Sequence, residues 1–328
     1  MAQVLQPIKE TYAGLDFPDL LVGLGSPDDA AVWKLDEDRA VVLTTDFFTP
    51  VVDDPYAYGA IAAANSMSDV YAMGGKPVLA LNVAALPADL PLEVSREIMR
   101  GAAEKSREAG VVIAGGHTVT DAEPKFGLVV MGLLDPNQML TKEGLQPGDS
   151  LFLSKPLGIG LATTALKRGL LGEEALGIIT DWMSRLNKDA AELALASGLA
   201  SATDITGFGL LGHASEMASA SDLGLELWYE QLPVHECALP CIDAFTYPGG
   251  AFNNRDYFGK NVTFDPALTE NQQMLIFDPQ TSGGLLMSVP ADAKEAFLAR
   301  AATKQVPVWE IGKVIADKVY KVLKNKPG

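Results

Sequence analysis

Short segments rich in aspartate, glycine, serine and threonine recur along the chain. They cover residues 27–31, 44–48, 65–69, 115–118, 203–209 and 278–284. Carboxylates that follow or interrupt apolar runs are costly to bury unless they are paired or bound to a cation. Their repetition therefore predicts convergence on a metal ion. Mg²⁺ fits best, because it takes oxygen ligands and usually shares them with the phosphates of a nucleotide.

Each segment also has an ordinary structural explanation when it is taken alone. Asp28 and Asp29 follow Gly, Ser and Pro at 25–27, which favours a turn. His117 follows two glycines, which would suit either a core histidine in a tight turn or a close backbone approach to a ligand. Asp204 could cap a helix that begins near Gly207. The conjunction of the segments is what favours a metal and nucleotide site.

Two predicted elements of the first half would position these carboxylates. The apolar, β-branched residues 40–45 predict a strand that ends at Asp46. Asp54 and the proline after it predict the start of an alanine-rich helix that continues to residue 73. Asn65 and Asp69 are four residues apart on that helix, so they are expected on one side, one turn apart.

The rest of the chain alternates between predicted strands and helices, which indicates an α/β fold. Strands are predicted at 78–83, 111–114, 126–134, 225–229, 285–289 and 308–314, and helices at 92–109, 160–168, 180–197 and 209–220. Residues 233–272 have too little periodicity for a prediction. The turn-rich segment 135–149 predicts a boundary between two domains, residues 1–140 and 141–328.

Composition excludes several classes of protein. The 328 residues are 48% hydrophobic and carry 25 Lys and Arg against 42 Asp and Glu, a net charge of −17. No basic track offers a surface for nucleic acid. No apolar run is long enough to span a bilayer, and the first ten residues lack the pattern of a signal peptide, so a cytoplasmic protein with no membrane partner is expected. Cys237 and Cys241 are expected to be reduced thiols.

Residues 207–212 match the dinucleotide-binding pattern G-x-G-x-x-G. That pattern requires a buried strand immediately before it, and residues 201–204 are too polar to predict one. The segment therefore predicts a glycine-rich helix start, which attracts anions. The Walker pattern is absent from the sequence, so phosphate chemistry here needs another architecture.

In this order and at these spacings, the segments resemble those of the selenophosphate synthetase family, also called selenide, water dikinase. The most specific parts are residues 44–48, 72–77, 114–118, 203–213 and 278–284. The families of thiamine-monophosphate kinase and aminoimidazole ribonucleotide synthetase share the themes around Asp29 and Asp46, whereas the last two runs are typical of the first family.

The resemblance implies two α/β domains of the aminoimidazole ribonucleotide synthetase-like fold, with strands from the N-terminal halves of two subunits forming a barrel across a homodimer. It also implies a reaction in which ATP, selenide and water give selenophosphate, AMP and orthophosphate. By motif, the Mg²⁺ ligands would be Asp29, Asp69 and Asp204. Nucleotide contacts would come from Asp46 and from Gly116, His117 and Thr118, the last three completing an ATP site shared with the neighbouring subunit.

Two departures from the family pattern affect this hypothesis. The family's nucleophilic cysteine or selenocysteine and a following lysine are expected upstream of Met1, so no catalytic residue is assigned within the chain, which is expected to bind Mg-ATP and make no selenophosphate. After residues 248–250 the family's threonine and arginine-asparagine pair is altered, with Arg255 displaced. The alternatives are a thiamine-monophosphate kinase-like small-molecule kinase and a non-catalytic nucleotide-binding paralogue.

Overall fold

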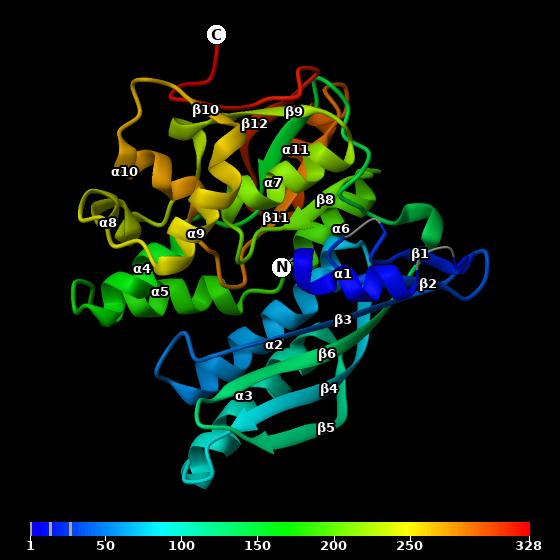
Figure 1. The fold of residues 1–328 in the computed structure, drawn as a ribbon, viewed down its shortest axis with the longest axis vertical. Helices are drawn as coiled ribbons and strands as arrows, with labels where there is room; N and C mark the ends of the chain where they lie inside the picture. Colours follow the sequence, from blue (N-terminus) through cyan, green and yellow to red (C-terminus); the bar gives the residue numbers. More distant parts are fainter. Residues whose placement is uncertain (1, 13–14, 26–27) are drawn as a thin grey trace.

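The computed structural model describes residues 2–12, 15–25 and 28–328. Two mixed β-sheets form within these residues, with helices packed on them (Figure 1). The first sheet has the strand order β1-β2-β3-β6-β4-β5, and the second has the order β10-β13-β9-β12-β7-β11-β8. The first sheet comes entirely from the N-terminal half of the chain and the second from the C-terminal half, which agrees with the predicted α/β architecture.

Among the described residues, the first half contains the helices α1 to α3 and the first sheet. Its elements are α1 (Ala2–Thr11), β1 (Leu20–Val22), β2 (Ala31–Lys34), β3 (Ala40–Phe48), α2 (Pro55–Ala72), β4 (Lys76–Leu86), α3 (Leu92–Ala109), β5 (Val112–Thr120) and β6 (Lys125–Leu134). The strand at 40–45, the helix capped by Asp54 and the helix closed by Gly110 are confirmed. β3 continues past its predicted end, so Asp46 lies within the strand.

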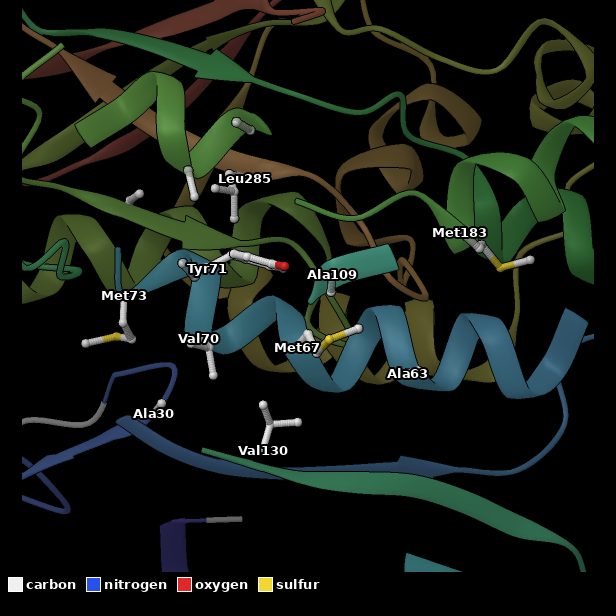
Figure 2. Close-up of a cluster of buried hydrophobic side chains, with 14 of the residues drawn as sticks. Ala30, Ala63, Met67, Val70, Tyr71, Met73, Ala109, Val130, Met183 and Leu285 are labelled. Carbon is white, nitrogen blue, oxygen red and sulfur yellow. The ribbon is translucent and has the colours of Figure 1, made fainter. Parts of the chain in front are cut away.

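Helix α2 lies at the centre of the molecule, because almost all of its residues are buried. Gly59 allows α2 and α3 to cross closely: a Cβ there would lie 1.9 Å from the Ile98 carbonyl oxygen. Figure 2 shows Met67 and Val70 of α2 in one apolar cluster with Val130 of β6 and Leu285 of β11 (Leu285–Val289). A single core therefore ties the N-terminal sheet to the second half of the chain.

The second half surrounds its sheet with short helices. Its remaining elements are η1 (Pro136–Gln138), β7 (Ser150–Leu153), α4 (Ile159–Lys167), α5 (Glu173–Ser184), α6 (Lys188–Ala196), β8 (Ala202–Asp204), α7 (Gly209–Ala220), β9 (Gly224–Trp228), η2 (Tyr229–Gln231), η3 (Glu236–Ala238), α8 (Leu239–Asp243), α9 (Gly249–Phe258), η4 (Gly259–Asn261), β10 (Val262–Phe264), α10 (Glu270–Gln273), η5 (Met274–Phe277), α11 (Lys294–Lys304), β12 (Trp309–Ile315) and β13 (Tyr320–Leu323). The helix at 209–220 and the strand at 285–289 are confirmed.

Three local predictions are wrong. The helix at 180–197 is two helices, because the chain turns at 185–187, where Asn187 donates hydrogen bonds to Ser68 and to the Gly283 carbonyl. A strand, β8, does precede the glycine-rich segment. Its residues are polar and did not indicate a strand, but they are buried and pair with β11, which stabilises the extended conformation. Residues 115–118 lie within β5 rather than in a turn, and the register with β4 shifts between Ala80 and Asn82 to accommodate them.

Across the described helices, none combines the length and apolar character needed to cross a membrane.

Candidate metal and nucleotide site

The first part of the site lies between β3 and α2. Thr44 donates a hydrogen bond to the Asp69 carboxylate (2.5 Å), and the Asn65 amide donates to the Asp46 carboxylate. Two residues along a strand and four along a helix cover nearly the same distance, about 6–7 Å. Each residue of the helix pair therefore meets its own partner on β3. The predicted shared face of Asn65 and Asp69 is confirmed.

Hydrogen bonds then join this part to the second half of the chain. Ser68 of α2 donates to the Asp204 carboxylate at the end of β8 (2.6 Å). Thr203 donates to Asp29 (2.8 Å), and Asp28 accepts from the backbone N–H of Asp29 (2.9 Å). The structure thus gathers Asp29, Asp46, Asp69 and Asp204 into one connected polar region. Residues 26 and 27, which precede the aspartate pair in its motif, lie outside the described residues.

Asp204 does not cap a helix, because the residue that caps α7 is Phe208, which makes no side-chain capping bond. The glycine-rich segment does provide the start of α7, where Gly209 adopts a φ of 71° and a Cβ would lie 2.8 Å from the backbone of Phe277. The tight packing of this turn explains its glycines without a dinucleotide.

A lysine that the sequence patterns did not indicate completes the region. The Lys142 ammonium lies 3.0 Å from Asp29 Oδ1 and 2.9 Å from Glu216 Oε2. Its backbone N–H donates to Asp28 Oδ2 (2.9 Å). Lys142 belongs to the segment between β6 and β7 that was predicted as the domain boundary. This segment therefore supplies a cation to the aspartates.

The carboxylates of this region lie in an environment that opposes their ionisation. Burial, followed by the charges of Asp204 and Asp29, raises the pKa of Asp69 well above its ordinary value. Burial and then the charge of Asp29 raise the pKa of Asp204 to about 7, and the same two causes raise that of Asp28 to about 6. Burial also raises the pKa values of Asp29 and Asp46. A bound cation would reverse these effects.

The donor set suits Mg²⁺ in its chemistry. The carboxylates supply oxygen atoms, and Asp29 Oδ2 is buried without a hydrogen-bond partner. Asp46 and Asp69 each retain partial exposure, so a ligand can reach them. Within the described residues, however, no three His, Cys, Asp or Glu side chains are arranged as a ready-made coordination shell. The residues fit a hydrated ion that shares its ligands with phosphate rather than an all-protein cage.

The segment at 278–284 supports this region from the second half. The Ser282 backbone N–H donates to Asn65 Oδ1 (3.0 Å), and the buried Lys155 ammonium donates to the Ser282 carbonyl (2.8 Å). Asp278 accepts from the Leu161 N–H in the first turn of α4 (3.2 Å), and burial raises the pKa of Asp278 to about 7. The structure therefore gives this aspartate a contact with a helix start rather than with the other carboxylates.

The predicted ATP contacts Gly116, His117 and Thr118 are not brought to the aspartates within one chain. They lie on β5, the edge strand of the first sheet, and all three are exposed. Exposure excludes the alternative that His117 is a core histidine. A Cβ at Gly116 would lie 2.3 Å from the Asn82 carbonyl oxygen, so the glycine permits close pairing of β5 with β4.

Arg255 is also engaged away from the aspartates. It lies on α9, 3.5 Å from Glu270, with its guanidinium over the Phe252 ring. The neighbouring Asn254 donates to the carbonyls of Gly207 and Phe277 (2.9 Å each), which anchors α9 to the glycine-rich segment.

Some contacting residues could have been found in the sequence. Thr44, Ser68 and Thr203 lie inside the aspartate motifs, where a hydroxyl beside a carboxylate indicates a hydrogen-bond donor. Lys142 and Asn187 carry no such signal, because each reaches the site from a segment without a motif.

Comparisons with known proteins show the family of the chain. Residues 27–134 match the family model of the AIR synthase related protein N-terminal domain, and residues 146–325 match that of the C-terminal domain. The selenide, water dikinase of Carboxydothermus hydrogenoformans is 46% identical over 325 residues, which are 99% of this chain and 93% of that protein. The selenide, water dikinase of Pelobacter propionicus is 46% identical over 321 residues, 96% of this chain and 92% of that protein.

A solved structure of AaThiL complexed with AMPPCP and TMP superposes with a TM-score of 0.71 at 21% identity, covering 99% of this chain and 94% of that one. At this identity the likeness shows the shared two-domain fold. The predicted fold and family are therefore confirmed: the chain belongs to the selenide, water dikinase family of AIR synthase related proteins.

Proposed function

We propose that this protein makes selenophosphate from selenide in an ATP-dependent reaction that also consumes water and releases AMP and orthophosphate. The observation that carries the proposal is the gathering of Asp29, Asp46, Asp69 and Asp204 from both halves of the chain into one polar region. The chain is 46% identical to two selenide, water dikinases over nearly its whole length, and this similarity supports selenide as the second substrate of the site.

In this proposal Asp29, Asp69 and Asp204 hold Mg²⁺, which neutralises phosphate charge when it is bound. Asp46 contacts the nucleotide beside Asn65. The side chain of Asn65 accepts from Ser282 while it donates to Asp46, so it holds the two halves of the site at a fixed spacing. We assign no selenide-binding nucleophile among the described residues. Cys237 and Cys241 are free thiols, and burial raises the pKa of both, which disfavours the nucleophilic thiolate.

We also propose a homodimer in which Gly116, His117 and Thr118 complete the ATP site of the neighbouring subunit. The outer face of the first sheet supports it, because Leu43, Phe47, Leu81 and Val119 are large apolar residues that are exposed in the single chain. Large apolar residues exposed on one sheet face favour an interface with another chain. Sedimentation of the wild type should show a dimer and Phe47→Glu should show a monomer; a monomeric wild type at micromolar concentration would remove the shared site.

The domain division 1–140 and 141–328 and a cytoplasmic location belong to the same proposal. Free cysteines and a requirement for ATP and selenide are consistent with a reducing, ATP-rich compartment.

The test combines calorimetry with phosphorus NMR. We expect Mg-ATP to bind to the chain, and we expect the protein as its gene encodes it to form selenophosphate and AMP from ATP and selenide. Absence of Mg-ATP binding would refute the nucleotide site. Binding of Mg-ATP without formation of selenophosphate would refute the reaction, and phosphorylation of thiamine monophosphate would identify a small-molecule kinase instead.

A further inference from the structure

We propose that Lys142 is a tethered counter-ion of the aspartate region: its ammonium neutralises Asp29 in the metal-free protein and remains with Glu216 when a divalent cation takes Asp29. The inference rests on the proposed function, because it needs a cation at the aspartates. It concerns a positioning residue, since Lys142 acts through Asp29 and Glu216.

Lys142 lies between two carboxylates of different character. The side chain of Asp29 is 3% exposed, that of Glu216 is 36% exposed, and that of Lys142 is 9% exposed. The two ion-pair distances, 3.0 and 2.9 Å, are nearly equal. The ammonium is therefore shared between a buried carboxylate of the site and a carboxylate at its edge. If the contact with Asp29 were lost, the Lys142 ammonium would still be paired with Glu216.

Glu216 depends on this lysine for its counter-charge. The other basic side chain near Glu216 is His213, whose Nδ1 lies 3.7 Å from Glu216 Oε2. Burial lowers the pKa of His213 to about 3, so the imidazole is neutral at physiological pH. His213 also shares a hydrogen bond with Thr206 through Nε2 (3.2 Å). Lys142 is thus the cation that pairs with both Asp29 and Glu216.

The backbone holds Lys142 in place. Its N–H donates to Asp28, and its carbonyl accepts from the Ser201 hydroxyl (3.4 Å). The preceding residue, Thr141, forms a parallel bridge with Ser201, directly before β8. The stem of Lys142 therefore starts beside the strand that ends in Asp204. Only the flexible end of the side chain has to move when its partner changes.

The physical need for a counter-ion follows from the charges. Five aspartates share this region, namely Asp28, Asp29, Asp46, Asp69 and Asp204. Among the lysines and arginines of the described ranges, Lys142 alone forms an ion pair with any of Asp29, Asp69 and Asp204. A divalent cation and an ammonium compete for the same oxygen atoms of Asp29. Removal of Lys142 should therefore strengthen binding of the divalent ion at Asp29. Removal of Glu216 should weaken that binding, because the ammonium then has Asp29 as its remaining partner.

The test measures Mn²⁺ binding to the full chain by electron paramagnetic resonance of the free ion, with and without ATP. We expect Lys142→Met to bind Mn²⁺ about five-fold more tightly than the wild type and to gain more thermal stability from it. Glu216→Gln should bind it about five-fold more weakly. Lys294→Met is the matched control, because Lys294 forms an ion pair with Glu310 away from the aspartates, and its binding should equal the wild type.

A double variant distinguishes the proposed change of partner by Lys142, from Asp29 to Glu216, from an effect of the net charge of the protein on Mn²⁺ binding. If Glu216 acts through Lys142, Glu216→Gln should change Mn²⁺ binding less than about two-fold once Lys142→Met is present. Equal or weaker binding by a folded Lys142→Met protein would overturn the inference and leave the metal site standing. If Lys142→Met does not fold, Glu216→Gln decides: unchanged Mn²⁺ binding by this variant overturns the inference, and weaker Mn²⁺ binding supports it. A wild type that binds no Mn²⁺ would overturn both this inference and the proposed metal site.

Discussion

Replacement of Asp204 by asparagine measures the energetic cost of the negative charge at the site. The carboxylate is buried at the end of β8 and accepts a hydrogen bond from Ser68, which in turn accepts one from Asn187. An asparagine oxygen can accept from the same hydroxyl, so the shape and the hydrogen bond are retained. What changes is the charge, and with it the proposed metal ligand.

The size of the effect follows from the raised pKa. Burial and the charge of Asp29 move the pKa of Asp204 from 3.8 to about 7, roughly three units at about 1.4 kcal/mol each, or on the order of 4 kcal/mol. Because the folded protein keeps a proton that the unfolded chain has lost, the free energy of unfolding decreases as pH rises from about 4 to about 7. Asp204→Asn should therefore be more stable than the metal-free wild type, with the full difference above pH 7.

The assay is urea denaturation in the presence of a chelator across pH 5 to 8, repeated at pH 8 with Mg-ATP. We expect the variant to gain stability without metal and to lose the stabilisation that Mg-ATP gives the wild type. Asp89→Asn, at an exposed turn, is the control and should change neither quantity by more than about 0.5 kcal/mol. A variant that is less stable than the metal-free wild type at pH 8, or one that Mg-ATP stabilises equally, would refute the electrostatic account.

Three further substitutions test individual contacts. Asn65→Ala removes two hydrogen bonds of a buried amide, so urea denaturation should show a loss of about 2 kcal/mol, and calorimetry should show weaker Mg-ATP binding. Burial lowers the pKa of His213 to about 3, so the free energy of unfolding falls as pH drops from about 6.5 to about 3; His213→Gln should flatten this decline in melting experiments. Gly160→Ala places a Cβ 2.4 Å from Asp278 Oδ1, which should cost about 2 kcal/mol in urea denaturation, and an unchanged midpoint would show that the contact is loose.

The elements that the sequence predicted well are those with local signals. Helix α2 has an aspartate cap and a proline in its first turn, and α3 ends at Gly110 in the left-handed conformation. The shared face of Asn65 and Asp69 also followed from local spacing, since the two residues are four positions apart on one helix. Their contacts with β3 became evident only in the structure. These features depend on residues a few positions apart, and one sequence contains that information.

β8, and the part of β5 that continues past its predicted end at Ala114, depend on partners that are distant in the sequence. β8 is a three-residue strand ending in Thr203 and Asp204, and it becomes a strand through pairing with β11, in which Leu285, the partner of Asp204, lies 285 − 204 = 81 residues later. In β5, Gly115 and Gly116 favour a turn by their type, but the neighbouring β4 holds them in an extended ladder. The presence of glycine alone does not distinguish a turn from an irregular strand, because glycine is common in both.

Lys142 could not be predicted from the sequence for the same reason. Its segment carries turn residues, and by composition it was predicted only as a domain boundary. The ion pair to Glu216 spans 74 residues, and the one to Asp29 spans 142 − 29 = 113 residues. A buried ammonium is favourable only where carboxylates or carbonyls accept its hydrogen bonds, and the carboxylates around Lys142 become neighbours only after both sheets have formed. The motifs therefore indicated the aspartates of the proposed site, whereas its lysine became evident only from the fold.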